Sequence, residues 1–417
     1  MATIVHVCPR YIPARGGAEL FFSKISEALS KRGHAVHVWT TDAATVRGFT
    51  SPPELRLPAS EPINGVEVRR FPVQYLPAQR YLRTAAHWLP FGTQWKCNTL
   101  RWTPWVPALT RAATRHAGPV DLVHVSSLPY SSILFAGIAL AEHTSARLVI
   151  SPFTHVAPPG PAGRAMRSAY LSPLNVGLLS KADRIFVQTE LERRALADVG
   201  ISTDRQAIVG LGVERSECTG GSRERARRSW RVDDSAVVVG HLANKSWDKG
   251  TIDLLDAAER LWDKGVRFVL VLAGPEMPSF TRRWSRARFP QWVVNLGELS
   301  DEERKDFFAA IDVFALPSYV ESFGLSPLEA ALNGAAVIAY DHGGPGQIFR
   351  NGENALLAPA GDIGGLSQML ELLTTNAAER ARLGGAACRL AGGYSWHRVL
   401  ELTLTAYDEL LMNTSRR

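Results

Sequence analysis

Short apolar runs alternate with helix-like segments along the whole chain. The runs are rich in Val, Ile and Leu without polar alternation, which is typical of strands buried on both faces of a parallel sheet. Between them, apolar residues recur at helical spacing. This order predicts parallel sheets covered by helices, in a doubly wound α/β arrangement. The predicted strands are Ile4–Cys8, Val36–Thr40, Val66–Phe71, Leu122–Val125, Leu148–Ser151, Ile185–Gln188, Ala207–Val209, Val237–His241, Phe268–Ala273, Val293–Leu296, Val313–Leu316 and Val337–Tyr340.

The length of 417 residues and a polar stretch near the middle predict two domains. One core rarely serves a chain this long, so two domains of roughly 200 residues each are expected. We place the boundary between Ile201 and Gly212, where the polar stretch Ser202–Gln206 lies, and expect a first domain of residues 1–206 and a second of residues 207–393. Residues 394–417 form a final helix, whose apolar positions between Trp396 and about Met412 must be buried.

Composition and charge narrow the class of protein. The chain is 46% hydrophobic and 21% charged, as in ordinary globular proteins, and its net charge of +7 favours anionic partners. The amino terminus is typical of a buried strand rather than a secretion signal, and the longest apolar stretch, Ile133–Ala141, is shorter than the ~18 residues of a spanning helix. The four cysteines lie far apart, which favours a reducing cytoplasm over a zinc or disulfide framework.

The segment from Glu321 to Glu329 is the most informative part of the sequence. It follows the buried strand that ends near Pro317, and it leads into a helix-forming run. Free backbone N–H groups at a helix start attract an anion, while two carboxylates eight positions apart accept hydrogen bonds from hydroxyls. The segment therefore suits a ligand that combines phosphate with sugar.

Three other loops carry candidate binding residues. Lys249 begins a helix after the strand Val237–His241, where its charge adds to the helix dipole and suits a diphosphate. Gly16 and Gly17 open the first helix and allow the backbone to approach a ligand closely. His155 lies just past the end of the strand Leu148–Ser151, at the edge where parallel sheets place their sites, although a structural histidine is the alternative.

The sequence Pro317-Ser-x-x-Glu321-Ser-Phe323-Gly324-Leu-Ser-x-x-Glu329-Ala resembles the signature of the retaining glycosyltransferases of family 4, also called glycosyl transferases group 1. The resemblance implies the GT-B fold, in which two doubly wound Rossmann-like domains face a central cleft. It also implies that the last helix crosses back to the first domain; a helix that stays on its own domain is the alternative. Further matches are Gly343–Ile348, Asn351–Asn354 and Pro359–Asp362, with Gln347 in place of a frequent Glu.

The resemblance also implies roles for individual residues. Glu321 would bind hydroxyls of the transferred sugar, Glu329 would bind the ribose, and Lys249 would hold the leaving diphosphate. His155 would lie near the reacting sugar. His241 occupies a donor-side position where the family usually has Arg, and neutral His cannot replace a guanidinium, so Lys245, Arg10 or Arg15 would have to compensate. The remaining donor-binding candidates are Gly16, Gly17, Phe323, Gly324 and Leu325.

The implied reaction is the retaining transfer of a sugar from a UDP or GDP sugar to a hydroxyl. The acceptor would be a glycan, a lipid-linked glycan or a small molecule, as in polysaccharide or glycolipid biosynthesis. The sequence has no Asp-x-Asp motif and no metal-ligand spacing, so we expect neither a metal nor another cofactor. Two alternatives stay open: a nucleotide-sugar epimerase of the same architecture, and a non-catalytic nucleotide-sugar-binding subunit.

A Trp- and Arg-rich insertion at about residues 75–116 interrupts the rhythm of strands and helices. Basic side chains mixed with indoles suit a peripheral contact with an anionic membrane, and a packed insertion that never touches lipid is the alternative. No nucleic-acid reader motif accompanies the segment, so we expect no nucleic-acid partner. The aromatic and basic residues are Tyr75, Arg80, Tyr81, Arg83, Trp88, Phe91, Trp95, Lys96, Arg101, Trp102, Trp105, Arg111 and Arg115.

Overall fold

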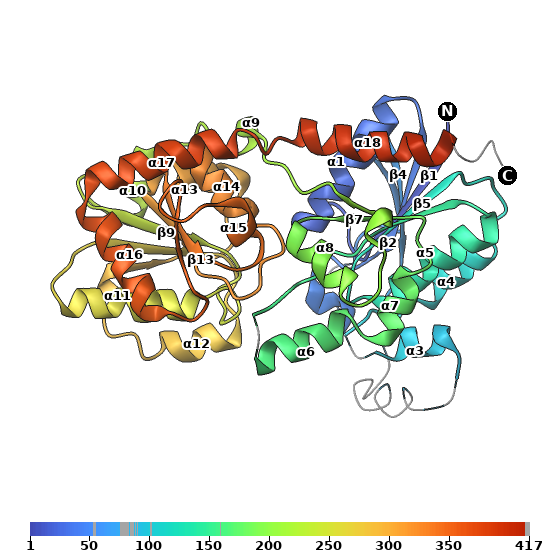
Figure 1. Cartoon of the computed structure of the whole chain (residues 1–417), viewed down its shortest axis with the longest axis horizontal. Coiled ribbons are helices and arrows are strands. Elements are labelled where there is room, and N and C mark those ends of the chain that lie inside the picture. The colour runs from blue at the N-terminus through green and yellow to red at the C-terminus, as the bar shows by residue number, and fades with distance from the viewer. Residues whose placement is uncertain are drawn as a thin grey trace. The chain divides into compact units, whose positions relative to one another are not determined.

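The computed structural model describes residues 1–52, 56–75, 83, 87, 89, 91–100, 102–158 and 160–412. The chain forms two compact α/β units, each with helices beside its own sheet (Figure 1). The first unit comprises Met1–Thr154, Arg164–Gly210 and Val399–Arg417, and the second comprises His155–Gly163 and Leu211–Arg398.

The sheet of the first unit is built around β1. Its described strands lie in the order β3-β4-β2-β1-β5-β6-β7-β8, and all neighbours are parallel except the antiparallel pair β3 and β4. The order runs outward from β1 in one direction and then from β5 in the other, which defines a doubly wound sheet. The strands are β1 (Thr3–Val7), β2 (Ala35–Thr41), β3 (Ser60–Ile63), β4 (Val66–Phe71), β5 (Leu122–Ser126), β6 (Arg147–Ser151), β7 (Arg184–Val187) and β8 (Gln206–Ile208).

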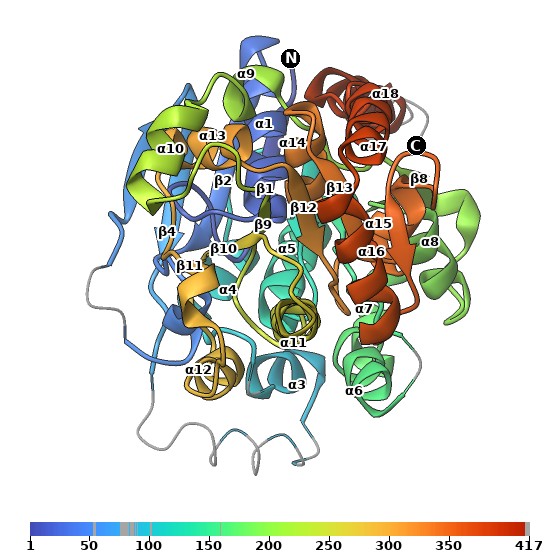
Figure 2. The same cartoon turned by 90° about the vertical axis from the view of Figure 1, so that its left-hand side faces the viewer.

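The second unit repeats this plan with a parallel sheet in the order β11-β10-β9-β12-β13-β14. Helices α13 (Asp301–Ala310) and α14 (Leu325–Leu332) pack their apolar residues on one face, and α11 (Thr251–Asp263) and α16 (Ile363–Thr375) pack theirs on the other (Figure 2). Both faces are therefore buried, as the unbroken apolar runs predict. The strands are β9 (Val238–Leu242), β10 (Val269–Ala273), β11 (Val293–Asn295), β12 (Val313–Leu316), β13 (Ala336–Tyr340) and β14 (Leu356–Ala358).

The described helices join successive strands along the chain. Those before residue 211 are α1 (Gly17–Lys31), α3 (Thr93–Thr99), α4 (Pro107–Thr114), α5 (Ser131–Thr144), α6 (Pro161–Tyr170), α7 (Pro173–Leu179) and α8 (Glu190–Ala197). Those that follow are α9 (Arg215–Cys218), α10 (Arg223–Trp230), α11 (Thr251–Asp263), α12 (Pro278–Trp284), α13 (Asp301–Ala310), α14 (Leu325–Leu332), α15 (Gly343–Ile348), α16 (Ile363–Thr375), α17 (Ala377–Ala391) and α18 (Trp396–Met412).

The predicted strands are present, with one assigned to the wrong sheet and two missed. The run Ala207–Val209, expected to begin the second domain, overlaps β8, which pairs with β7 in the first sheet. Its apolar residues fit either sheet, so local pattern could not choose between them. β3 was missed because it is a short, polar edge strand; the turn Asn64-Gly65, with φ of 50° and 80°, was an available hairpin signal. β14, with three residues, was also missed.

Helix α18 is fixed to the first unit by a buried polar group. The Tyr407 hydroxyl contacts His6 Nε2 at 3.2 Å and His124 Nδ1 at 2.5 Å. His124 Nε2 also contacts Ser151 Oγ at 2.8 Å, so the two histidines connect β1, β5 and β6 to the helix. Burial lowers the pKa of His6 to about 3, which keeps its imidazole neutral.

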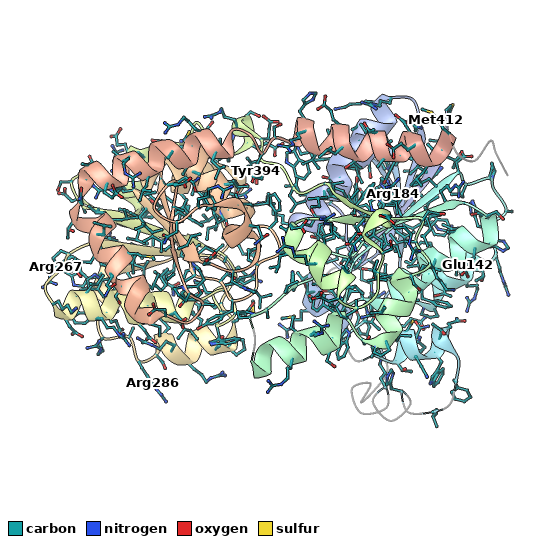
Figure 3. All side chains as sticks on the ribbon, viewed as in Figure 1. Glu142, Arg184, Arg267, Arg286, Tyr394 and Met412 are labelled. Carbon is teal, nitrogen blue, oxygen red and sulfur yellow. The ribbon has the colours of Figure 1, made fainter. Side chains whose placement is uncertain are left out.

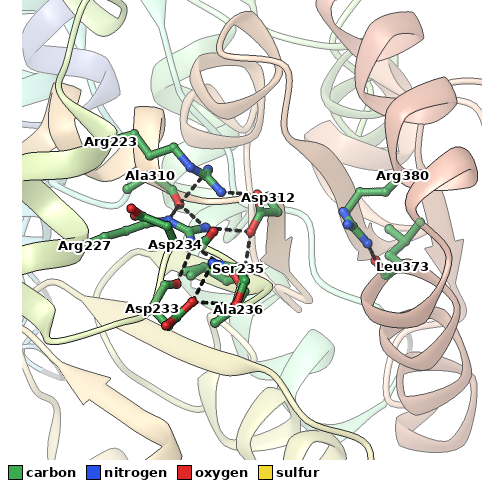
Figure 4. A network of polar contacts seen from close by, with 11 residues as sticks. Arg223, Arg227, Asp233, Asp234, Ser235, Ala236, Ala310, Asp312, Leu373 and Arg380 are labelled. Atoms are coloured by element: carbon green, nitrogen blue, oxygen red, sulfur yellow. Dashed lines mark hydrogen bonds and ion pairs between the residues drawn. The ribbon is translucent and has the colours of Figure 1, made fainter.

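Arg227 connects α10 to the sheet of the second unit (Figure 4). Its guanidinium donates to the carbonyl oxygens of Asp233, Asp234, Ala236 and Ala310, and Nη2 lies 2.8 Å from Asp312 Oδ2. Only 1% of this side chain is exposed, so its charge is held almost entirely by protein oxygens.

Most other charged side chains lie at the surface, as Glu142, Arg267 and Arg286 do in Figure 3. Within the part of the chain that the structure describes, no helix has both the length and the apolar composition needed to cross a membrane. In the Trp- and Arg-rich insertion, four of the residues singled out above lie outside the described residues: Arg80, Tyr81, Trp88 and Arg101.

Candidate functional site

Two candidate loops of the second unit meet where its strand order reverses. β9 and β12 are hydrogen-bonded neighbours at this point, and the loops with Lys249 and Glu321 follow their carboxyl ends. Open α/β sheets bind ligands at such a switch point, because the loops on either side diverge and leave a crevice. The topology therefore brings together residues that are 72 positions apart in the sequence.

Backbone contacts join the two loops. The N–H groups of Tyr319 and Val320 donate to the Asp248 carbonyl oxygen at 2.9 and 3.2 Å. Gly250 adopts φ of +68°, and a Cβ at this position would lie 1.7 Å from the carbonyl oxygen of Pro317. Only glycine permits this approach in this conformation, so the geometry of the loop requires glycine at position 250, directly after Lys249.

Lys249 and Glu321 form an ion pair within this junction. Lys249 Nζ lies 3.0 Å from Glu321 Oε2 and donates to the Val320 carbonyl oxygen at 2.7 Å. Each side chain is 18% exposed, so both charges are largely shielded yet reachable. Burial acts to raise the pKa of Glu321, but the Lys249 charge and hydrogen bond outweigh it and lower the pKa. The site therefore holds a carboxylate and an ammonium group side by side.

His155 lies close enough to Lys249 and Glu321 for both charges to influence its pKa. Burial lowers the pKa of His155 to about 4, and the Lys249 charge acts in the same direction while Glu321 opposes it. The ring is therefore neutral near pH 7. The domain expected to contain His155 was residues 1–206, but the structure groups His155–Gly163 with the second unit. His342 Nε2 contributes to this grouping by donating to the Val156 carbonyl oxygen at 2.8 Å.

The loop before α14 lies against Gly343 and Gly344, the first two residues of α15. Gly324 precedes the helix with φ of +97°, and no side chain caps the N–H groups that begin at Leu325. The Gly344 N–H donates to the Glu321 carbonyl oxygen at 2.9 Å. A Cβ at Gly344 would lie 1.9 Å from the carbonyl oxygen of Phe323, so the two segments are in backbone contact. These helix-start N–H groups suit an anionic oxygen.

Glu329 lies further along α14 and is only 6% exposed. Its Oε1 pairs with the Arg304 guanidinium, whereas its Oε2 is buried with no hydrogen-bond partner in the described structure. Burial raises the pKa of this carboxyl despite the Arg304 charge. A buried acceptor without a donor is costly, and a ligand hydroxyl would satisfy it. Arg304 was missed from the sequence because nothing there linked α13 to α14.

His241 lies in β9, and its imidazole is enclosed by protein atoms. The ring is fully buried, with Nδ1 2.8 Å from the Ala315 carbonyl oxygen and Nε2 2.9 Å from Thr251 Oγ1. Both nitrogens thus contact protein atoms, and the donor-binding role expected of His241 stays a prediction. Lys245 is equally occupied: Nζ donates to the Leu296 carbonyl oxygen at 2.6 Å and is 1% exposed.

Gly16 and Gly17 lie in the first unit at the start of α1. A Cβ at Gly16 would lie 2.3 Å from Glu19 Oε2, and the Glu19 carboxylate pairs with Arg10 Nη2 at 2.6 Å. Glycine therefore leaves room for an ion pair beside the helix start. This pair accounts for Arg10, which was one of the basic residues expected to compensate for His241.

Comparison with known proteins identifies the two units as parts of one enzyme family. A family model described as Glycosyl transferase 4-like domain matches residues 16–212, and one described as Glycosyl transferases group 1 matches residues 222–389. A protein of Rhodococcus erythropolis named D-inositol 3-phosphate glycosyltransferase is 26% identical over 98% of this chain and 90% of its own length. One of the same name from Acidothermus cellulolyticus is 28% identical over 98% and 89%.

Solved structures with the same architecture are more distant in sequence. Sucrose-phosphate synthase from Thermosynechococcus elongatus superposes with a TM-score of 0.77 at 18% identity, covering 99% of this chain and 100% of that one. Anabaena HepE in complex with UDP and glucose gives 0.73 at 18% identity, covering 98% and 100%. The fold is therefore GT-B, as the resemblance to family 4 implied.

Proposed function

Because the chain belongs to the group 1 glycosyltransferases, we propose that it transfers a sugar from a nucleotide diphosphate sugar to an acceptor hydroxyl with retention of configuration. We assign donor binding to the second unit and acceptor binding to the first. The observation that carries this assignment is the Lys249–Glu321 ion pair at the switch point of the second sheet. A cation for phosphate and an acceptor for hydroxyls are both needed by such a donor.

The donor would divide its polar groups among the residues already described. Glu329 Oε2, buried and unpartnered, would accept from a ribose hydroxyl, and Glu321 would accept from hydroxyls of the transferred sugar. The diphosphate would lie between Lys249 and the uncapped N–H groups at Leu325. Carboxylates repel phosphate, so this division keeps like charges apart.

Chemistry at the site would depend on charge stabilisation without a protein nucleophile. The bond between the sugar C1 and the diphosphate oxygen breaks as the acceptor oxygen bonds to C1 on the same face. The acceptor proton passes to the departing diphosphate. Lys249 would neutralise the charge that develops on the leaving group, and neutral His155 would contact the reacting sugar. These fixed charges perform the role of a divalent cation, so we expect full activity in the presence of EDTA.

The test is transfer by the purified protein from UDP and GDP sugars to acceptors that include D-inositol 3-phosphate and glycan fractions. NMR of the product would show the same anomeric configuration as the donor. Alanine at Lys249, Glu321 or Glu329 should reduce kcat/KM at least 100-fold, about 3 kcal/mol. Lys264→Ala, an exposed lysine just after α11, serves as the matched control and should leave activity unchanged.

Other outcomes would identify the alternative functions. Rearrangement of the donor sugar in the absence of any acceptor would indicate an epimerase. Donor binding without turnover across the acceptor panel would indicate a non-catalytic subunit. Inverted product, or full activity in all three alanine variants, would overturn the proposal itself.

We also propose that the first unit contacts an anionic membrane through α3 and α4. Phe91 and Trp95 are 52% and 38% exposed, and their ring centroids lie 4.9 Å apart. They line a cavity of about 770 Å³ together with Arg111 on α4 and Arg115 directly after it. Exposed aromatic rings beside guanidinium groups match the chemistry of a lipid interface.

Cosedimentation with vesicles tests this contact. Binding should require an anionic lipid such as phosphatidylglycerol and should be lost in high salt. Phe91→Ser with Trp95→Ser should weaken it, whereas Leu372→Ser, at an apolar position 39% exposed on the second unit, should not. Equal binding by all variants would mean that this surface is not the contact.

A further inference from the structure

We propose that Glu192 is a positioning residue that clamps the loop leading to His155. The inference rests on the proposed role of His155 in the transfer reaction. Glu192 has no place in the family signature considered above, and it lies on α8, 37 positions beyond the histidine in sequence. Its effect on the reaction would pass through the backbone of Thr154, the residue directly before His155.

The clamp is made by both oxygens of one buried carboxylate. Glu192 Oε1 accepts from the Thr154 N–H at 2.5 Å, and Oε2 accepts from the Gln188 N–H at 2.7 Å. The side chain is 2% exposed, and no basic side chain pairs with it among the residues that the structure describes. Its partners are therefore two backbone N–H groups, one at the end of β7 and one on the loop after β6.

The loop that Glu192 holds contains an unfavourable backbone conformation. Phe153 has φ of +50°, in the left-handed region that side chains with a Cβ rarely adopt. Its ring is 6% exposed and packs edge-on against Phe21, with centroids 5.7 Å apart. Packing holds the Phe153 side chain, and the Glu192 carboxylate holds the Thr154 N–H. The backbone that leads into His155 is therefore fixed at two consecutive residues. Such conformations gather at functional sites when their surroundings enforce them.

A simple helix-capping role does not account for this carboxylate. Thr189 caps α8 through its own hydroxyl, which accepts from the Glu192 N–H at 3.2 Å. In a capping box the third residue of the helix would accept from the cap residue's N–H. Glu192 instead reaches Gln188 and then Thr154, which is 38 positions away in the sequence. The helix end is capped without it, so the second contact serves the loop.

The protonation state of Glu192 offers a signature of the clamp. Burial raises its pKa to about 7, and the hydrogen bonds from the Gln188 and Thr154 N–H groups act against this rise. No charged side chain contributes to the shift in the described structure. A proton on either oxygen would put an O–H group against an N–H donor. The clamp is therefore complete above about pH 7 and incomplete below it.

The test compares the full-length wild type with Glu192→Gln, whose amide imitates the protonated acid. We expect kcat to fall about 10- to 100-fold, since a displaced catalytic group costs that much, while KM for the donor changes less than about twofold. The wild-type kcat should decline as pH falls through about 7, and the kcat of the variant should not show this decline. Glu190→Gln, on the same helix turn but paired with Arg193 at the surface, is the matched control and should behave as wild type.

A double-mutant cycle separates this inference from the proposed function. His155→Ala should lower kcat, and adding Glu192→Gln should then have little further effect, because both changes act through one residue. If His155→Ala has no effect, the proposed function fails at that residue. If His155→Ala is impaired but Glu192→Gln turns over normally, or if the two losses simply multiply, the clamp is refuted.

Amide hydrogen exchange tests the clamp without an activity assay, and the wild-type measurement does not require a folded variant. In the wild type, the Thr154 N–H should be protected at pH 8 and less protected at pH 6, after correction for intrinsic exchange rates. The same amide should exchange rapidly in Glu192→Gln at both pH values. Rapid exchange of the Thr154 N–H in the wild type at pH 8, or equal protection of this amide in the wild type and in Glu192→Gln at pH 8, would overturn the clamp.

Discussion

Replacing Gly250 with alanine tests whether the contact between the two loops of the second unit builds the proposed donor site. The added Cβ would lie 1.7 Å from the Pro317 carbonyl oxygen and 2.5 Å from its carbon, so the backbone must move. The left-handed φ of +68° costs about 1 kcal/mol for any residue with a Cβ. Overpacking against backbone adds about 1–3 kcal/mol. We therefore expect Gly250→Ala to lower the unfolding free energy by about 3 kcal/mol.

Gly265→Ala separates conformation from contact. Gly265 also has a left-handed φ, +86°, but a Cβ there would meet no heavy atom within 4 Å. This variant should lose only the conformational term of about 1 kcal/mol. For a unit of this size the two losses correspond to Tm decreases of about 9 °C and about 3 °C.

The assays are thermal unfolding of the nucleotide-free protein and steady-state kinetics with the donor. Because Lys249 precedes Gly250 directly, displacement of this loop should raise KM for the donor about tenfold in Gly250→Ala, whereas Gly265→Ala should keep the wild-type value. The reasoning is refuted if both variants lose the same stability. It is equally refuted if Gly250→Ala binds the donor as tightly as the wild type.

Three further variants test buried polar contacts inside each unit. Tyr407→Phe removes the hydroxyl shared by His6 and His124, so urea unfolding should show a loss of about 1–3 kcal/mol; an unchanged midpoint would contradict the network. Burial lowers the pKa of His241 to about 4 from 6.5, so the unfolded state binds its proton first as pH falls. Stability should then decrease between about pH 6.5 and 4, by up to about 3 kcal/mol from this residue, and His241→Gln should reduce that slope. Arg227→Met removes the guanidinium that donates to the carbonyl oxygens of Asp233, Asp234 and Ala236, while Arg223 still donates to Asp312, and we expect a loss of about 1–3 kcal/mol by the same urea assay.

Local pattern was sufficient for the elements that contain the site. The strands before Lys249 and Glu321 are short and mainly apolar, which is typical of buried parallel strands. The segment Glu321–Glu329 showed a loop passing into a helix, and Gly324 marks that passage in the structure with a left-handed φ. Strand β3 was not predicted, because its polar and partly exposed residues lack the apolar pattern of a buried strand.

Partners across the fold were beyond the reach of local pattern. His241 stands where the family usually has an arginine, and only the structure shows that its ring is enclosed between Ala315 and Thr251. Arg304 and Glu192 gave no signal, because each meets its partner from a helix that the sequence cannot orient. A charged residue in a polar stretch resembles any solvated residue until its neighbours are known.

By itself, the sequence determined two doubly wound units and the order of their strands and helices along the chain. These properties follow from periodicity and from glycine's conformational range, which act over a few residues. Tertiary structure alone decided that β8 belongs to the first sheet, that Lys249 pairs with Glu321, and that Glu192 grips the backbone before His155. The reason is physical: hydrogen bonds and ion pairs depend on distances of a few ångströms between atoms that chain folding, rather than chain order, brings together.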